Sequence, residues 1–349
     1  MRYFPMLLTA VLAVLLAGCG NPDRGIPNPQ KSVYFWKTVY DPDSLETAFV
    51  TSHQIKKLYI RYFDVILDKD QQLQPNATIR FRKRPEGFQE LVPTVFIVEK
   101  CLYHNLDTLA HTIVDRIIQI SKTNHVDNVG EIQIDCDWTR KSQDKYFVFL
   151  GKVHEYCKTL NLRLSATIRL HQLGMAPPPC DYGVLMLYNT GNVHNNRVEN
   201  PILGYPQVKP YLRYLKDYPL PMCAALPNFK WQMLNSNGEF RKILYNLDMD
   251  DSTMFAPIDS ATYLVTLTRL IPLYMGDQSF NVRLLRGDTI RIRKAEYAEI
   301  SRVVSDIQDI RPALLSQVII YDLNSYNINN LNKLQYEEIF NTCGSPAVD

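Results

Sequence analysis

The chain has 349 residues, with 38 Lys and Arg against 36 Asp and Glu, which gives a formal net charge of +2 at pH 7. This balance, with no block of basic residues, lacks the electrostatic footprint of a nucleic-acid-binding protein, so we expect no nucleic-acid partner. No second long apolar run follows the amino terminus, which excludes a polytopic membrane protein. The length allows one large domain or two smaller ones.

The amino terminus has the pattern of an exported lipoprotein precursor. Arg2 precedes an apolar run from Phe4 to Leu16 that is too short to span a bilayer comfortably. The run ends in Leu16-Ala17-Gly18-Cys19, which resembles the lipobox of bacterial lipoproteins. We predict that residues 1–18 are a signal peptide, that Cys19 carries the lipid, and that residues 19–31 form a polar tether. An ordinary secretory signal is the alternative.

Lipidation of Cys19 would fix the location of the protein. Two or three acyl chains on one residue hold a soluble domain stably, because a single chain binds only marginally. The predicted location is the bacterial cell envelope, with the membrane as a partner through the lipid. Asn21-Pro22-Asp23 does not resemble a strong inner-membrane retention signal, so we favour the outer membrane, on its periplasmic or surface face.

The other cysteines do not predict a metal centre. The six that follow Cys19 are widely spaced and include no C-x-x-C pair. Export makes disulfides possible, but Cys136 and Cys223 lie in apolar runs where buried free thiols are typical. No spacing matches a zinc site, and we expect neither a metal nor another cofactor.

Strand-like and helix-like patterns alternate along the rest of the chain, which predicts a parallel sheet with crossover helices. The predicted strands are Val33–Tyr40, Lys57–Val65, Pro93–Cys101, Glu131–Asp137, Arg163–Leu170, Tyr182–Asn189, Met222–Leu226 and Gln317–Asp322. Eight strands in this order predict an α/β fold, a (β/α)₈ TIM-type barrel over residues 32–349.

One interval, about 228–312, is too long for a structureless loop. Within it, Phe280–Leu285 and Thr289–Ile292 flank Arg286-Gly287-Asp288, which predicts a hairpin turn. Ala295–Ile310 has a helical pattern. We therefore expect an α+β insertion between strands seven and eight.

The fourth predicted strand carries the strongest chemical signal. Alternation points Ile132, Ile134, Cys136 and Trp138 toward the helices, and Gln133, Asp135, Asp137 and Thr139 into the barrel. Two close carboxylates raise the pKa of one of them, which acid–base chemistry exploits. The alternative is a structural pair held by an inward arginine, with Arg61 and Arg169 as candidates.

Two segments carry a family resemblance. Asp135-Cys136-Asp137-Trp138-Thr139 resembles the D-x-D-x-E signature of chitinase-type (family 18) glycoside hydrolases, and Leu185-Met186-Leu187-Tyr188-Asn189 resembles their M-x-Y-D/N segment. Together with the Arg61–Val65 strand, they also resemble glycoside hydrolase-like TIM-barrel lipoproteins of bacteria. The resemblance implies catalytic or binding roles for Asp135 and Asp137, and substrate contacts for Tyr188 and Asn189.

The chain departs from this signature at one position. Thr139 stands where the family has the glutamate that protonates the glycosidic oxygen. A threonine hydroxyl is not an acid near neutral pH, and loss of such a proton donor costs roughly 10²–10⁴-fold in rate. Glu99, near the end of strand three, and Asp322, near the end of strand eight, are possible substitutes. His171, after strand five, is a possible base.

Other residues near the predicted rim could contact a sugar. Trp231, just beyond strand seven, is the best stacking candidate among the aromatic residues, while Trp138 should pack against the helices. Arg61, Tyr188, Asn189 and Asp322 complete the predicted substrate-binding set.

Three functions remain open at this point. The first is a lipid-anchored, glycosidase-like barrel that binds a glycan with degenerate or absent hydrolase activity. The second is an active glycoside hydrolase that uses Asp135 and Asp137 with another acid. The third is a scaffold lipoprotein that binds an envelope protein through the insertion. Thr139 favours the first over the second, and the inward carboxylates favour both over the third.

Overall fold

The computed structural model describes residue 26 and residues 29–195, 199–275 and 278–342. Cys19, the predicted signal peptide and Cys343 lie outside the described residues. No described helix is both long enough and apolar enough to cross a membrane.

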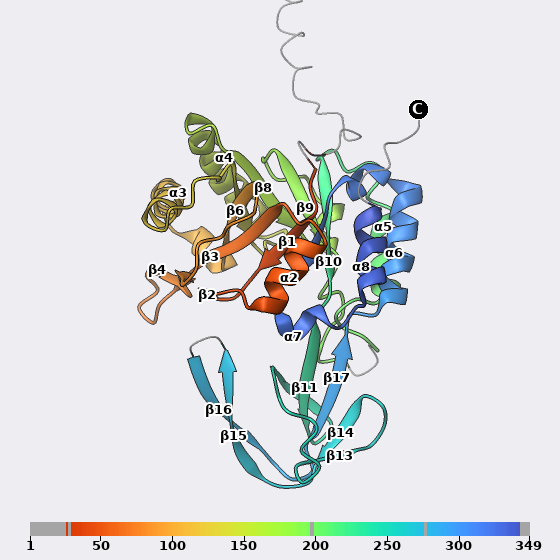
Figure 1. Ribbon diagram of the computed structural model, residues 1–349. Helices are drawn as coiled ribbons and strands as arrows, with labels where there is room; N and C mark the ends of the chain where they lie inside the picture. The colour runs from red at the N-terminus through yellow and green to blue at the C-terminus, as the bar shows by residue number, and fades with distance from the viewer. Residues whose placement is uncertain (1–25, 27–28, 196–198, 276–277, 343–349) are drawn as a thin grey trace, which may run out of the picture.

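Eight parallel strands form a closed barrel, as predicted (Figure 1). In order around the barrel they are β1 (Ser32–Phe35), β3 (Lys57–Leu67), β6 (Glu90–Ile97), β7 (Glu131–Asp135), β8 (Arg163–Ile168), β9 (Tyr182–Met186), β10 (Met222–Pro227) and β18 (Val318–Tyr321). The pairing of β1 with both β18 and β3 closes the sheet. Short additions lie beside this barrel: β4 (Leu73–Asn76) pairs with β3, and β2 (Val39–Tyr40) pairs with β5 (Arg80–Phe81).

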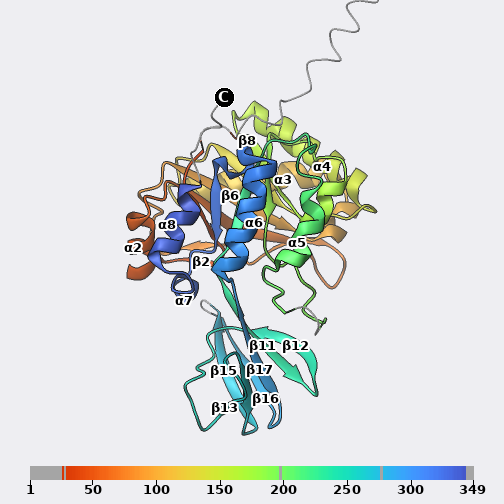
Figure 2. The same cartoon turned by 90° about the vertical axis from the view of Figure 1, so that its right-hand side faces the viewer.

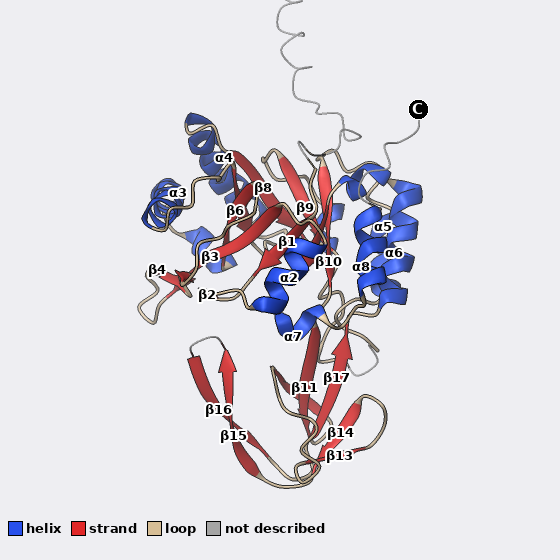
Figure 3. Ribbon diagram, viewed as in Figure 1, coloured by secondary structure: helices blue, strands red, loops and turns tan. Residues whose placement is uncertain are grey.

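Helices surround the barrel (Figure 3). They are α2 (Ser44–Ser52), α3 (Leu106–Thr123), α4 (Gln143–Thr159), α5 (Tyr205–Leu212), α6 (Tyr297–Ile310), α7 (Ser325–Ile328) and α8 (Lys333–Asn341), with 3₁₀ turns η1 (Glu99–Tyr103), η2 (Leu170–Gly174) and η3 (Pro312–Ser316). The helical spacing of Leu109, Ile113 and Ile117 buries one face of α3 against the sheet, which explains the amphipathic pattern in the sequence.

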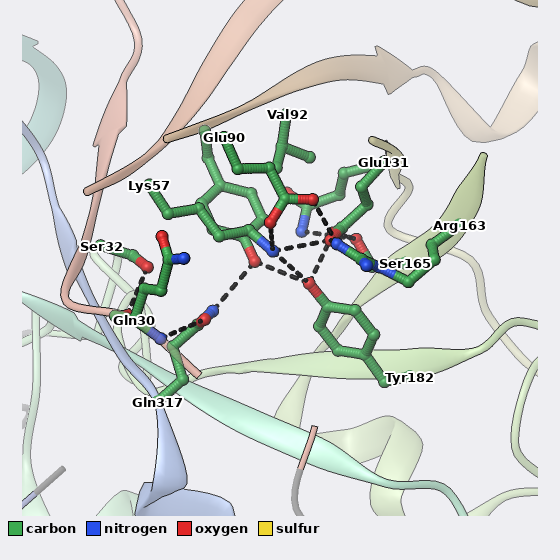
Figure 4. A network of polar contacts seen from close by, with 12 residues as sticks. Gln30, Ser32, Lys57, Glu90, Val92, Glu131, Arg163, Ser165, Tyr182 and Gln317 are labelled. Atoms are coloured by element: carbon green, nitrogen blue, oxygen red, sulfur yellow. Dashed lines mark hydrogen bonds and ion pairs between the residues drawn. The ribbon is translucent and has the colours of Figure 1, made fainter. Parts of the chain in front are cut away.

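The amino-terminal half of the barrel interior is filled by polar side chains (Figure 4). Lys57 is fully buried, and its Nζ lies 2.7 Å from Glu131 Oε2 and 3.3 Å from Glu90 Oε2. The hydroxyls of Tyr182 and Ser165 each donate to Glu131 Oε1 at 2.6 Å. These contacts satisfy charges that would otherwise be costly to bury.

The interval between β10 and β18 holds strands and the α-helix α6, as expected, and the strands and the helix pack differently (Figure 2). A five-stranded sheet has the order β12 (Glu239–Leu244), β11 (Lys230–Ser236), β17 (Thr289–Lys294), β14 (Thr262–Val265) and β13 (Phe255–Pro257), and β15 (Arg269–Met275) pairs with β16 (Gln278–Leu284). These strands have their own hydrophobic core. Helix α6 instead buries Ile300, Val303 and Ile307 in the core of the barrel. We call the strands β11 to β17 the β insertion.

The predicted hairpin within this interval is wrong in its pairing. A turn does form, with Gly287 at a φ of 96° and Asp288 N donating to Leu285 O at 3.0 Å. However, β16 pairs with β15, whereas β17 pairs with β11 and β14. The turn therefore connects strands of two different sheets. Which strands pair depends on contacts between distant parts of the chain, and the local sequence does not predict this pairing.

Candidate functional site

The carboxyl ends of the barrel strands surround a cavity of about 280 Å³, which we call the mouth cavity. This end of a TIM barrel is where side chains from several strands converge. Its lining residues are Trp36, Arg61, Asp64, Phe96, Asp135, Arg169, Met186, Tyr188, Asn189 and Tyr321.

Asp135 lies at the base of the mouth cavity, where its carboxylate is almost fully buried. Thr167 Oγ1 donates to Asp135 Oδ1 at 2.6 Å, and Arg169 Nη2 lies 3.2 Å from the same oxygen. Burial raises the pKa of Asp135, and the nearby charge of Asp137 adds to this effect, while Arg169 opposes it. Asp135 therefore points into the barrel, as strand alternation predicted.

Arg169 holds both aspartates of the signature. Its Nε donates to Asp137 Oδ1 at 2.5 Å, while its Nη2 contacts Asp135. Burial acts to lower the pKa of Arg169, but Asp135 and Asp137 together raise it further above its ordinary value. Of the two arginines considered from the sequence, Arg169 is the one that pairs with these carboxylates.

Arg61 pairs with Asp64, a residue that the sequence pattern did not identify as part of the site. Its Nε donates to Asp64 Oδ1 at 2.8 Å, and its Nη2 contacts the other oxygen. Two residues three apart on a regular strand point to opposite faces, but the register of β3 against β6 shifts between Arg61 and Phe63. This bulge turns both Arg61 and Asp64 toward the mouth cavity.

Four aromatic side chains contribute to the wall of the mouth cavity: Trp36, Phe96, Tyr188 and Tyr321. The rings of Tyr188 and Tyr321 stack with centroids 4.6 Å apart, and Arg61 lies over Trp36 at 5.7 Å. The hydroxyl of Tyr188 is buried and has no hydrogen-bond partner among the described residues. An unsatisfied buried hydroxyl is costly, so it is a candidate to bond a ligand.

Thr139 and Glu99 contact each other instead of the mouth cavity. Thr139 Oγ1 donates to Glu99 Oε1 at 2.7 Å, and the Ser142 hydroxyl donates to the same oxygen. These hydrogen bonds, from Ser142 first and then Thr139, lower the pKa of Glu99. Glu99 begins η1, just after the end of β6, and it is not among the residues that line the cavity.

Asp322 and Trp231 also lie outside this lining. Asn327 Nδ2 donates to Asp322 Oδ1 at 2.8 Å, and the backbone N of Asp322 donates to Asn228 Oδ1 at 2.7 Å. Burial raises the pKa of Asp322 to about 6. Trp231 packs on Phe229, with ring centroids 5.4 Å apart, so it serves as packing at the start of the β insertion.

A second cavity of about 320 Å³ adjoins the first and shares Arg169, Met186, Tyr188 and Asn189 with it. Asp137 and His171 are among its other lining residues. Trp138 faces the helix layer, as predicted, and stacks on Tyr146 of α4 with centroids 5.6 Å apart. Within the described part of the chain, no group of three or more His, Cys, Asp or Glu side chains could hold a metal ion.

Comparisons with known proteins identify the fold of the chain but not a family. No protein-family model matches the chain, and no curated protein matches its sequence. Solved structures do match: a chitinase from Chromobacterium violaceum has a TM-score of 0.53 at 10% identity, covering 91% of this chain and 99% of that one. The barrel has a glycoside hydrolase-like fold.

Two further structures agree. A family GH18 chitinase from Cycas revoluta, solved with allosamidin, has a TM-score of 0.52 at 10% identity and covers 90% of this chain and 100% of its own. The spore cortex-lytic enzyme SleL of Bacillus cereus has a TM-score of 0.51 at 12% identity, over 90% of this chain and 74% of its own. At such identities the likeness is one of fold.

Proposed function

We propose that this protein is a lipid-anchored protein of the bacterial cell envelope that binds a glycan in the mouth of its barrel without hydrolysing it. The observation that carries the proposal is the state of the signature carboxylates. Arg169 pairs with both Asp135 and Asp137, and the position of the family's proton donor is occupied by Thr139.

Hydrolysis of a glycosidic bond needs an acid that can reach the leaving oxygen. Glu99 is held as a carboxylate by two hydroxyls, and Asp322 is bonded to Asn327 away from the mouth cavity. Asp137 is committed to Arg169. None of these groups offers a proton to a ligand in the cavity, which supports binding over cleavage.

The mouth cavity nevertheless has the features of a sugar site. Sugar rings stack on aromatic faces, and a few fixed polar groups then set the orientation of the ligand. Trp36 supplies a face, and Tyr188 and Asn189 supply hydrogen-bonding groups. A Cycas revoluta GH18 chitinase mutant with the same type of barrel is solved in complex with (GlcNAc)4, so chito-oligosaccharides are the first ligands to test.

Binding and cleavage can be measured on the same soluble form, residues 20–349. Calorimetry with chito-oligosaccharides and peptidoglycan fragments tests binding, and release of reducing ends tests cleavage. We expect binding without cleavage, weakened at least 10-fold by Trp36→Ala or Tyr188→Phe. Tyr103→Phe is the matched control, because Tyr103 is 57% exposed and lies outside both cavities.

One observation favours the alternative of an active hydrolase. The raised pKa of Asp135 gives this chain a buried carboxyl group that can hold a proton closer to neutral pH than an ordinary aspartate. Reducing ends that appear with the wild type and disappear with Asp135→Asn would establish this alternative and end the non-hydrolytic proposal.

A protein-binding role for the β insertion is favoured by a different feature. Several large apolar side chains on it are exposed, among them Ile258 at 58%, Leu267 at 51% and Leu270 at 58%. Exposed apolar side chains that gather on one element mark interaction surfaces in many proteins. Cross-linking from this element to a single envelope protein, together with no glycan binding, would support the scaffold role.

A further inference from the structure

We propose that the protein stands on its membrane with the amino-terminal end of the barrel toward the lipid headgroups, so that the mouth cavity and the β insertion point away from the bilayer. This inference rests on the lipid anchor proposed above at Cys19. It deepens the proposed function by naming the ligand class: a glycan presented from beyond the anchoring membrane, not a glycolipid headgroup within it.

The chain enters the fold at the amino-terminal end of the barrel strands. The backbone N of Gln30 donates to Gln317 Oε1 at 3.3 Å (Figure 4). The Gln30 side chain donates to Gln89 Oε1 at 3.0 Å. Gln317 and Gln89 directly precede β18 and β6. In addition, Lys31 O accepts a hydrogen bond from Lys56 N, just before β3. Three strand starts therefore fix the entry point opposite to the mouth cavity.

The connection from this point to Cys19 is short. Ile26 is only 3% exposed and belongs to the hydrophobic core of the barrel, so its position is fixed by packing. Cys19 precedes it by seven positions. A fully extended chain covers at most about 3.6 Å per residue, so the lipidated residue stays within about 25 Å of Ile26.

The far end of the β insertion, on the side of the mouth cavity, lies beyond that reach. A strand of six residues such as β10 spans about 20 Å, and the seven residues of β11 continue for about 23 Å on the far side. To bring the end with the β insertion onto the bilayer, the tether would also have to pass around a helix layer about 10 Å thick. The total path of roughly 50 Å is about twice the available length.

The charges at the entry end fit a lipid surface. Lys122 and Lys158 lie in the last turns of α3 and α4, which end near the starts of β7 and β8, and both side chains are exposed. Lys56, before β3, is exposed as well. Asp127 lies at the same end but pairs with Arg84. Exposed lysines near a bilayer are attracted to anionic headgroups.

Energy transfer in vesicles tests the orientation with the full lipidated chain. A donor dye is attached through a clickable amino acid that replaces exposed Lys158 at the entry end, or exposed Glu239 at the start of β12. Vesicles of phosphatidylethanolamine and phosphatidylglycerol carry an acceptor on their headgroups. We expect at least threefold stronger quenching of the donor at position 158 than of the donor at position 239.

Two controls separate the orientation from the anchor. Cys19→Ser should abolish vesicle binding, and a flexible Gly/Ser insertion of about 40 residues after Pro22, with an end-to-end distance of about 35 Å, should erase the difference between the two donors. Equal quenching with the native tether, or stronger quenching at position 239, would overturn the orientation alone. Absence of lipid on Cys19 by mass spectrometry would overturn the anchor and this inference together.

Discussion

Arg169 determines the charge state of the mouth cavity at the scale of single residues. Arg169 forms ion pairs with Asp135, which is only 3% exposed, and with the exposed Asp137. Loss of one partner from a buried ion pair is far more costly than the net contribution of the pair, because the other charge remains desolvated.

Arg169→Met should therefore destabilise the protein by about 3–5 kcal/mol at pH 8. Without the guanidinium, the pKa of Asp135 rises further, so the folded state retains a proton that the unfolded state has lost and stability falls as pH rises. Urea denaturation at pH 8 and pH 4.5 should show the larger loss at pH 8. The double variant Asp135→Asn/Arg169→Met should recover most of the free energy of unfolding that Arg169→Met loses. An equal loss of stability in Arg169→Met at both pH values would contradict this account.

Asp322 provides a second pH-dependent prediction. Its pKa is about 6 in the folded protein against 3.8 ordinarily, so between these values the folded state binds more protons and stability decreases as pH rises. Asp322→Asn keeps an oxygen that can accept from Asn327 but removes the buried charge. We expect it to stabilise the protein by about 2–3 kcal/mol at pH 7.5 and by much less at pH 4. Thermal unfolding across this range is the measurement, with exposed Asp250→Asn as the control.

At the scale of elements, β3 and β7 are joined across the barrel interior by Lys57 and Glu131, both fully buried. Such a pair specifies how these strands pack, since a shift of register would separate the charges. The aspartates at the carboxyl end of β7 depend on this register for their place in the mouth cavity.

Lys57→Met should cost about 3–5 kcal/mol in urea denaturation, because it removes the fully buried cation of Glu131 and Glu90 and leaves them only Arg163, whose side chain is 33% exposed. The matched control is Lys333→Met, which breaks the exposed pair with Glu337 on α8 and should cost less than about 1 kcal/mol. Similar losses for the two variants would show that burial does not set the cost.

The sequence predicted these elements because the signals were local. Apolar runs and alternation located the eight barrel strands, and alternation oriented Asp135 and Trp138 correctly. The bulge in β3 breaks the period of two, so Asp64 could not be assigned to the interior from spacing. Tyr321 and Trp36 join Tyr188 only after the barrel closes between β1 and β18, a contact between distant parts of the sequence.

At the scale of the whole molecule, the β insertion and the barrel have separate hydrophobic cores. Replacement of residues 230–294 by a short Gly/Ser linker should therefore leave a folded barrel, since α6 packs on the barrel rather than on the insertion. Circular dichroism and a cooperative unfolding transition would show this. Loss of cooperative unfolding would mean that the two cores depend on each other.

The polar interior of the barrel has a consequence for heat capacity. Exposure of apolar surface raises the heat capacity on unfolding, whereas exposure of polar surface lowers it. Lys57, Glu131, Gln133 and Tyr182 occupy positions where TIM barrels commonly place branched aliphatic side chains. Unfolding should then show a smaller heat-capacity change per residue than an aliphatic barrel of equal size, and a flatter dependence of stability on temperature.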